Sequence, residues 1–220
     1  MSLVPVKTPL MVKKMFPNYV WDINTHDKVI YLTFDDGPTP DITEWTLETL
    51  KKYDAKATFF CIGNNIENHP NIVREIVKEG HSIGNHTYNH LKGWKTKTSD
   101  YLSNVNLCQS VLKSQISNPK NHHSTTVNLF RPPYGRIKPK QAKKLMALGY
   151  RIVMWDVLSF DWDKNISQET CFENIKENAT NGSIIVFHDS IKASKNMMYA
   201  LPKVLDYYGK QGYAFKPLAV

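Results

Sequence analysis

Short apolar runs alternate along the chain with longer amphipathic stretches. The apolar runs have the length and the β-branched and aromatic content of strands, and they cover residues 29–34, 57–62, 82–84, 127–131, 151–155, 183–187 and 213–218. The stretches between them repeat apolar residues at helical spacing and predict helices near 42–53, 70–79, 99–116, 138–148, 168–179 and 196–210. Pro70 suits a first helical turn, and Gly80 and Gly149 follow the last turns of two of these helices, which supports the assigned ends.

Strands that alternate with helices indicate a parallel sheet covered by helices. The predicted strands are apolar at nearly every position, as is typical of strands buried on both faces. Seven such units fit an α/β fold, a distorted (β/α)7 TIM-like barrel in a single domain, better than two domains. An open doubly wound sheet is the structural alternative. We assign residues 1–27 to an irregular lead-in that packs across the barrel, 28–220 to the barrel domain and 117–126 to a polar loop.

The chain is basic, with 28 Lys and Arg against 20 Asp and Glu, a net charge of +8 and a pI near 9.2. Lysines cluster at 92–97 and 138–144, where solvated surfaces are the simplest interpretation. A basic protein accumulates near anionic polymers. The sequence holds no recognised nucleic-acid-binding motif, so we expect no nucleic-acid partner.

The sequence has no run of about 18 apolar residues, so we expect no membrane span. Lysines and prolines interrupt the first 20 residues, which do not resemble a secretion signal, and we therefore expect a cytoplasmic protein, although its natural N-terminus could be longer. The three cysteines, Cys61, Cys108 and Cys171, are odd in number and lack C-x-x-C spacing. We predict that they are reduced, buried thiols.

Ionisable side chains gather where the predicted strands end. They are Asp35 and Asp36, His86 after Asn85, Arg131, Asp156 after Trp155, and His188 with Asp189. Active sites of α/β barrels are built at this edge of the sheet. Two adjacent carboxylates repel each other, and their burial costs several kcal/mol unless a cation or a hydrogen bond compensates.

His86 and His90 lie four residues apart. On a helical turn these positions share one face, so both imidazoles can reach one ion. An isolated pair of this kind could equally be two unrelated surface histidines. Beside an unexplained aspartate pair, however, it favours a hydrolytic metal centre of two histidines and one carboxylate. The second aspartate would then act as a base toward water on the metal.

The motifs TFDDGP, NHTYNH, RPPYGR, DW at 161–162 and VFHDS follow one another in this order. In these motifs the chain resembles the polysaccharide deacetylases of carbohydrate esterase family 4, which remove N- or O-acetyl groups from sugars. The resemblance covers roughly residues 28–218. It implies a distorted (β/α) barrel and makes 28–220 the catalytic domain.

The resemblance also implies the roles of the residues that bind the metal and activate water. It makes Asp36, His86 and His90 the ligands of one divalent ion, most often Zn²⁺ and in some members Co²⁺ or Ni²⁺. Asp35 matches the general base, and Arg131 orients that base and keeps it charged.

Three further residues match the groups that stabilise and resolve the tetrahedral intermediate. The backbone N–H of Tyr134 corresponds to an oxyanion donor. His188 matches the general acid that protonates the leaving nitrogen, and Asp161 matches the carboxylate that raises its pKa. One departure concerns this carboxylate: Leu158 stands where family members often have a further aspartate. Asp156, Asp163 and Asp189 are therefore alternative partners of the acid.

For the substrate, Trp162 and Val186 match walls of a small pocket for the acetyl methyl, and we add Pro132 and Trp94 as candidate substrate-binding residues. The first hypothesis is metal-dependent removal of acetyl groups from glycans that contain N-acetylglucosamine, of the peptidoglycan or chitin type. An O-acetyl or non-sugar amide hydrolase, or a catalytically silent glycan-binding barrel, is the alternative.

Overall fold

The computed structural model describes residues 4–116 and 128–219, so the predicted loop 117–126 lies outside the described residues. The strands are β1 (Val29–Asp35), β2 (Ala57–Cys61), β3 (Ser82–Asn85), β4 (Leu129–Phe130), β5 (Arg151–Ile152), β6 (Val157–Leu158), β7 (Ile184–His188) and β8 (Ala214–Phe215). The helices are α1 (Leu10–Met15), α2 (Ile42–Lys52), α3 (Gly63–Asn68), α4 (Pro70–Lys78), α5 (Thr98–Ile116), α6 (Pro139–Ala147), α7 (Gln168–Lys176) and α8 (Ser194–Lys210), with short 3₁₀ turns η1 (Gly93–Lys95) and η2 (Pro133–Gly135).

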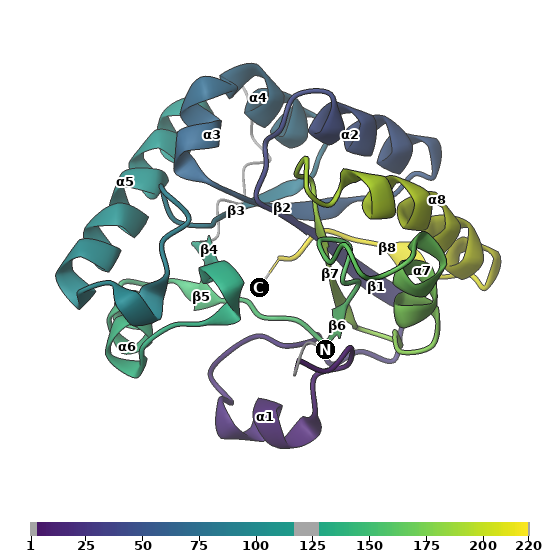
Figure 1. Ribbon diagram of the computed structural model, residues 1–220, viewed down its shortest axis with the longest axis horizontal. Coiled ribbons are helices and arrows are strands. Elements are labelled where there is room, and N and C mark those ends of the chain that lie inside the picture. The colour runs from purple at the N-terminus through teal and green to yellow at the C-terminus, as the bar shows by residue number, and fades with distance from the viewer. Residues whose placement is uncertain (1–3, 117–127, 220) are drawn as a thin grey trace.

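The strands pair in parallel in the order β5-β4-β3-β2-β1-β7-β6, and β8 adds to β1 outside this path. The sheet curls, and helices α2 to α8 surround its outer side (Figure 1). The strand order follows the chain around the curl, without the reversal that defines a doubly wound sheet. The predicted distorted barrel is therefore confirmed, and the open-sheet alternative is wrong.

Alternation along β1 separates the core from the interior of the barrel. Ile30, Leu32 and Phe34 are fully buried in the cluster shared with the surrounding helices. The ring of Phe34 stacks on Phe59, with 5.0 Å between the ring centroids. Asp35 and its neighbours on the other face therefore point into the barrel, at the carboxyl end of the strand.

The sequence pattern missed several short elements, namely α1, α3 and β6. Six-residue helices and a two-residue strand are too short to show a period. Of the predicted strand 151–155, only residues 151–152 form β5. The strand β6 follows at 157–158, so Asp156 lies between two short strands rather than at the end of a long one.

Residues 4–22, here called the N-terminal strap, lie along the side of the barrel between β5 and β6 (Figure 1). Val20 forms a parallel bridge with Val153, and Lys7 forms an antiparallel bridge with Val157. The strap therefore makes backbone contact with the chain next to both edge strands, at the side where the curled sheet does not close on itself.

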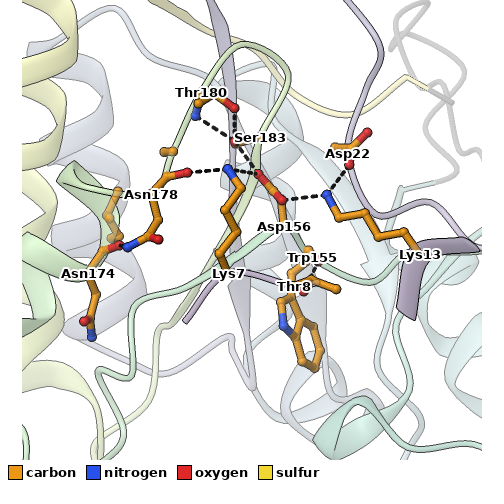
Figure 2. Close-up of polar contacts among 12 residues, drawn as sticks. Lys7, Thr8, Lys13, Asp22, Trp155, Asp156, Asn174, Asn178, Thr180 and Ser183 are labelled. Atoms are coloured by element: carbon orange, nitrogen blue, oxygen red, sulfur yellow. Dashed lines mark hydrogen bonds and ion pairs between the residues drawn. The ribbon is translucent and has the colours of Figure 1, made fainter. Parts of the chain in front are cut away.

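Asp156 anchors this strap (Figure 2). Its buried carboxylate lies 2.6 Å from Nζ of Lys13 and 3.3 Å from Nζ of Lys7, and it accepts a 2.6 Å hydrogen bond from Oγ of Ser183. Ser183 directly precedes β7, so these contacts lie at the amino end of that strand. The expectation that Asp156 lies at the carboxyl ends of the strands, with the site, is thus wrong. Its charge is compensated by Lys7 and Lys13 at the amino end of the sheet.

Cys61, Cys108 and Cys171 are free and buried, as predicted. Burial raises the pKa of the Cys108 thiol to about 12, so this side chain packs as a neutral group. Within the described part of the chain, the helices are all too short or too polar to cross a bilayer.

Candidate active site

A cleft of about 850 Å³ opens at the carboxyl ends of β1, β2, β3 and β7. It contains four of the ionisable residues that the strand ends were expected to gather, namely Asp35, Asp36, His86 and His188. Its lining includes Asp35, Asp36, Ile62, Asn65, His86, His90, Tyr134, Trp155, Leu158, Trp162, Val186, His188 and Lys192.

Asp36, His86 and His90 form a group whose ligand atoms all lie within 4.8 Å of one another. Oδ1 of Asp36 is 3.6 Å from Nε2 of His86 and 3.2 Å from Nε2 of His90. This oxygen is buried and has no hydrogen-bond partner. A buried carboxylate oxygen facing two imidazole nitrogens is costly unless a cation lies between them.

The predicted helical turn at residues 86–90 is wrong, because the two histidines lie on a loop. Thr87 and His90 have positive φ, 65° and 52°, and the loop is held by hydrogen bonds from the backbone N–H groups of Thr87 to Oδ1 of Asn85 and of Leu91 to Oγ1 of Thr87. The result is still a close pair of rings, with centroids 5.1 Å apart. A left-handed backbone conformation costs energy at a residue other than glycine, and residues strained in this way are concentrated at functional sites.

The loop after β1 holds Asp36 in a similar conformation, with φ at 79°. Nδ2 of Asn65 donates to the carbonyl oxygen of Asp36 at 2.8 Å, and the N–H of Gly37 donates to Oδ1 of Asp189 at 3.1 Å. A Cβ on Gly37 would lie 2.0 Å from Oδ2 of Asp189, so this position requires glycine. Sequence reasoning did not find the positioning roles of Asn65 and Asp189, which depend on contacts between distant strands.

Arg131 holds Asp35 inside the barrel. The guanidinium is fully buried; Nη1 donates to Oδ1 of Asp35 and to Oγ1 of Thr33, both at 2.7 Å, and Nη2 donates to the carbonyl oxygen of Met154 at 2.7 Å. Its plane also lies over the ring of Phe60, 4.2 Å from the centroid. Burial lowers the pKa of Arg131, and the Asp35 carboxylate opposes this change. The two side chains form a buried ion pair in which the guanidinium N–H groups have hydrogen-bond acceptors.

The backbone carbonyl of Arg131 orients His86, one of the three candidate metal ligands. Nδ1 of His86 is 2.8 Å from this oxygen, which places Nε2 toward Asp36. Burial lowers the pKa of His86 to about 4, so the ring is neutral near pH 7. A neutral imidazole whose other nitrogen is bound to a carbonyl is the usual form of a metal-binding histidine.

His188 is the cross-strand neighbour of Asp35 in the register of β1 and β7. Its Nδ1 lies 2.9 Å from Oδ1 of Asp161, and its backbone N–H donates to Oδ2 of the same carboxylate at 2.6 Å. Burial lowers the pKa of His188, but the charge and hydrogen bond of Asp161 outweigh it and raise the pKa to about 9. The imidazolium form therefore persists at neutral pH.

The alternative partners of His188 are engaged elsewhere. Asp156 binds the strap, Asp189 accepts hydrogen bonds from Gly37 and Thr43, and Asp163 caps a turn by accepting from the N–H of Asn165. Leu158 lines the cleft and packs with Trp162 and Val186 in a small apolar cluster.

The candidate substrate residues divide into two groups. Trp162 and Val186 line the cleft, and the ring of Trp162 meets His188 edge-on at 4.8 Å. Pro132 is buried and Trp94 is half-buried, and neither is among the lining residues. Trp94 instead packs edge-on against the half-exposed ring of Tyr134, at 5.4 Å.

Tyr134 sits at the tip of η2 with φ at 60°. Within residues 128–136 the hydrogen bonds of this turn run from Gly135 to Pro132 and from Arg136 to Pro133, and the N–H of Tyr134 takes part in neither. Gly135 is required next to it, because a Cβ there would lie 2.1 Å from the indole of Trp155. Trp155, which sequence reasoning left without a role, thus fixes the turn that carries Tyr134.

Known proteins share both the sequence and the fold of this chain. A family model described as polysaccharide deacetylase matches residues 22–153. The chain is 37% identical over 213 residues to a peptidoglycan-N-acetylglucosamine deacetylase of Bacillus cereus, with 94% of each chain covered. It is 31% identical over 207 residues to a chitooligosaccharide deacetylase of Azorhizobium caulinodans, with 89% of this chain and 95% of that one covered.

A solved structure of a peptidoglycan N-acetylglucosamine deacetylase, in complex with a naphthyl-substituted N-oxidanyl-benzamide, superposes with a TM-score of 0.85. The identity is 32%, and the alignment covers 96% of this chain and 95% of that one. The chain therefore belongs to the polysaccharide deacetylase family, a family of hydrolases, as its motifs predict.

Proposed function

We propose that this chain hydrolyses the acetyl amide of glycans that contain N-acetylglucosamine, with a divalent ion held by Asp36, His86 and His90. The observation that carries the proposal is the buried, unpartnered Oδ1 of Asp36, which faces Nε2 of both histidines beside an Arg-bound carboxylate and an Asp-bound histidine. The names of the relatives support the substrate class.

The donor set fits the proposed ion. One carboxylate oxygen and two imidazole nitrogens are ligands that zinc prefers, and cobalt and nickel accept the same set. Burial opposes ionisation of Asp36, yet the neighbouring histidines outweigh burial and hold the pKa of its carboxyl well below its usual range. Bound there, the ion would polarise the acetyl carbonyl and lower the pKa of water.

We assign to Asp35 the role of taking the proton from the attacking water. It adjoins a ligand in the chain, lines the cleft and is held by the guanidinium of Arg131. Because Arg131 uses its other donors on Thr33 and on main-chain oxygens, the Asp35 carboxylate cannot rotate away without breaking a buried network. This fixed position is what a general base requires.

The leaving nitrogen needs a proton, because an amide anion is too basic to depart. His188 supplies it: the pKa near 9 keeps the ring charged at neutral pH, and Asp161 binds Nδ1, which leaves Nε2 for the substrate. The N–H of Tyr134, which takes part in neither hydrogen bond of its own turn, is the donor proposed for the oxyanion. Trp162, Val186 and Leu158 supply the apolar walls for the acetyl methyl.

Acetate release from N-acetylglucosamine oligomers and from peptidoglycan tests the proposal. Metal-stripped protein should release little, and added Zn²⁺, Co²⁺ or Ni²⁺ should restore release. If none of these ions restores release from either substrate, the acetylated-amino-sugar assignment is wrong, and O-acetyl esters and non-sugar amides are assayed next. Fractionation of cells that produce the natural protein tests the cytoplasmic location.

A further inference from the structure

Four side chains at one side of the cleft form a continuous cluster, here called the basic-aromatic rim: Lys92, Trp94, Tyr134 and Arg136. Nζ of Lys92 lies 5.6 Å from the ring centroid of Tyr134, and Cζ of Arg136 lies 4.6 Å from that of Trp94. The two rings meet edge-on at 5.4 Å. Two cations are thus packed on a pair of aromatic rings that also touch each other.

Hydrogen bonds, one of them buried, join the loop of η1 to Lys138 and α6, which directly follow the loop of η2. Nε2 of the fully buried Gln141 donates to the carbonyl oxygens of Gly93 at 3.0 Å and of Thr96 at 3.3 Å. Nζ of Lys138 donates to the oxygen of Thr96 at 2.8 Å. The rim is therefore presented by a fixed pair of turns, η1 and the loop of η2, rather than by independent surface loops.

The rim adjoins the catalytic groups, since the ring of Tyr134 lies 4.6 Å from that of His90. Lys92 and Arg136 are exposed, and among the ion pairs of residues 4–116 and 128–219 neither has a carboxylate partner. A third basic side chain, that of Lys192, lines the cleft itself. Among the described residues that line the cleft, only Asp35 and Asp36 carry carboxylates, and Asp35 is paired with the buried Arg131. The exposed charges of Lys92, Arg136 and Lys192 therefore favour an anion at the mouth of the cleft.

We propose that the basic-aromatic rim binds carboxylates of an anionic glycan, so that the enzyme prefers acidic, peptidoglycan-type strands to neutral, chitin-type strands. This inference rests on the proposed function and decides between the two substrates that it leaves open. The aromatic rings supply stacking surfaces for sugars of either kind. Lys92 and Arg136 supply charge that only an acidic strand can use.

The charge of the product favours the same substrate. A chitin-type strand is neutral, and each deacetylation adds an ammonium group, which a basic rim repels. A peptidoglycan strand alternates N-acetylglucosamine with a sugar that bears a lactyl group, which ends in a free carboxylate or in a peptide with its own carboxylates. These anions attract the rim before and after the reaction, and the attraction weakens as salt screens it.

The test compares the double variant Lys92→Gln/Arg136→Gln with Lys52→Gln/Lys78→Gln. The control loses the same charge from exposed positions at the carboxyl ends of α2 and α4, on the opposite side of the sheet. Three probes are used: N-acetylglucosamine tetramer, peptidoglycan strands with the peptides removed, and strands with the peptides intact. Acetate release gives kcat/KM for each, equilibrium binding gives Kd, and both are measured at about 0.05 M and 0.5 M salt.

For the rim variant we expect kcat/KM on the acidic strands to fall roughly 3- to 10-fold, with a smaller change on the neutral tetramer and with the salt dependence lost. A loss on both peptide-free and intact strands identifies the lactyl carboxylate as the group bound, and a loss on intact strands alone identifies the peptide carboxylates.

Three results would overturn the inference: an equal loss on the neutral tetramer, an equal loss in the control variant, or no loss. If the parent protein releases acetate from none of the probes, the proposed function fails separately, and the Kd values still decide whether the rim binds acidic strands.

Discussion

The alkaline limit of activity should depend on the ion pair between His188 and Asp161. Asp161→Asn removes the charge while keeping an oxygen that can accept one of the two hydrogen bonds from His188. The rise of the His188 pKa from 6.5 to about 9 corresponds to about 3 kcal/mol in favour of the charged ring. Without the charge on Asp161, only the smaller effects of Asp36 and Asp35 oppose burial, and the pKa of His188 should fall back toward 6.5.

The assay is kcat of the metal-loaded enzyme as a function of pH. Activity of the parent should fall as the pH rises through about 9, and activity of Asp161→Asn should fall at least about two pH units lower, because the acid is then deprotonated at neutral pH. Asp163→Asn is the matched control, since Asp163 caps a nearby turn without touching His188. An NMR titration of the imidazole reads the same pKa without turnover. An unchanged alkaline limb in Asp161→Asn would refute the assigned role.

The same pair makes stability depend on pH. The pKa of His188 is higher in the folded than in the unfolded protein, so its stabilisation is complete below the unfolded pKa of about 6.5 and is lost as the pH rises through about 9. Urea unfolding of the parent and of Asp161→Asn should therefore differ by about 3 kcal/mol near pH 6 and much less near pH 10. A difference that does not shrink with rising pH would contradict the linkage.

Four further substitutions separate the remaining roles. Asp36→Ala should lose metal affinity in a calorimetric titration. Asp35→Asn should keep the metal and lose at least about 100-fold in kcat. Equal turnover in Asp35→Asn and the parent would show that Asp35 is not the base. Arg131→Met should cost about 3–5 kcal/mol of unfolding free energy, because a carboxylate and three other buried acceptors lose their donor. The exposed Arg74→Met is the control and should cost less than about 0.5 kcal/mol. Similar losses in both variants would refute the buried network. Gly135→Ala should lower kcat more than it lowers metal affinity, because the added methyl displaces the indole that holds the oxyanion turn; an unchanged kcat would remove that turn from the mechanism.

The apolar pattern predicted the barrel because each long strand is buried and each long helix is amphipathic. It failed at β6, where two residues pair with β7 and no period can appear. Asp156 was assigned to the wrong end of the sheet for this reason, since a strand drawn through 151–155 points it toward the site. Lys13, which compensates its charge, lies 143 residues earlier in the chain, and no local pattern reports such a contact.

The candidate ligands were predictable from their residue types, but their backbone was not. Spacing four residues apart suggests a helical turn, yet His90 reaches its place through a left-handed backbone held by Asn85 and Thr87. The motifs identified Asp161 as the partner of His188 correctly despite Leu158. Asn65 and Asp189 were missed because a positioning residue carries no signal of its own in a single sequence.

The N-terminal strap also sets an order for biogenesis. Its bridges and ion pairs join residues 7–22 to residues 153–183, so on the ribosome the strap emerges well before its binding site exists. At about 5–20 residues per second, that interval is on the order of ten seconds. The strap therefore cannot take its final place until residues 153–183 have been synthesised.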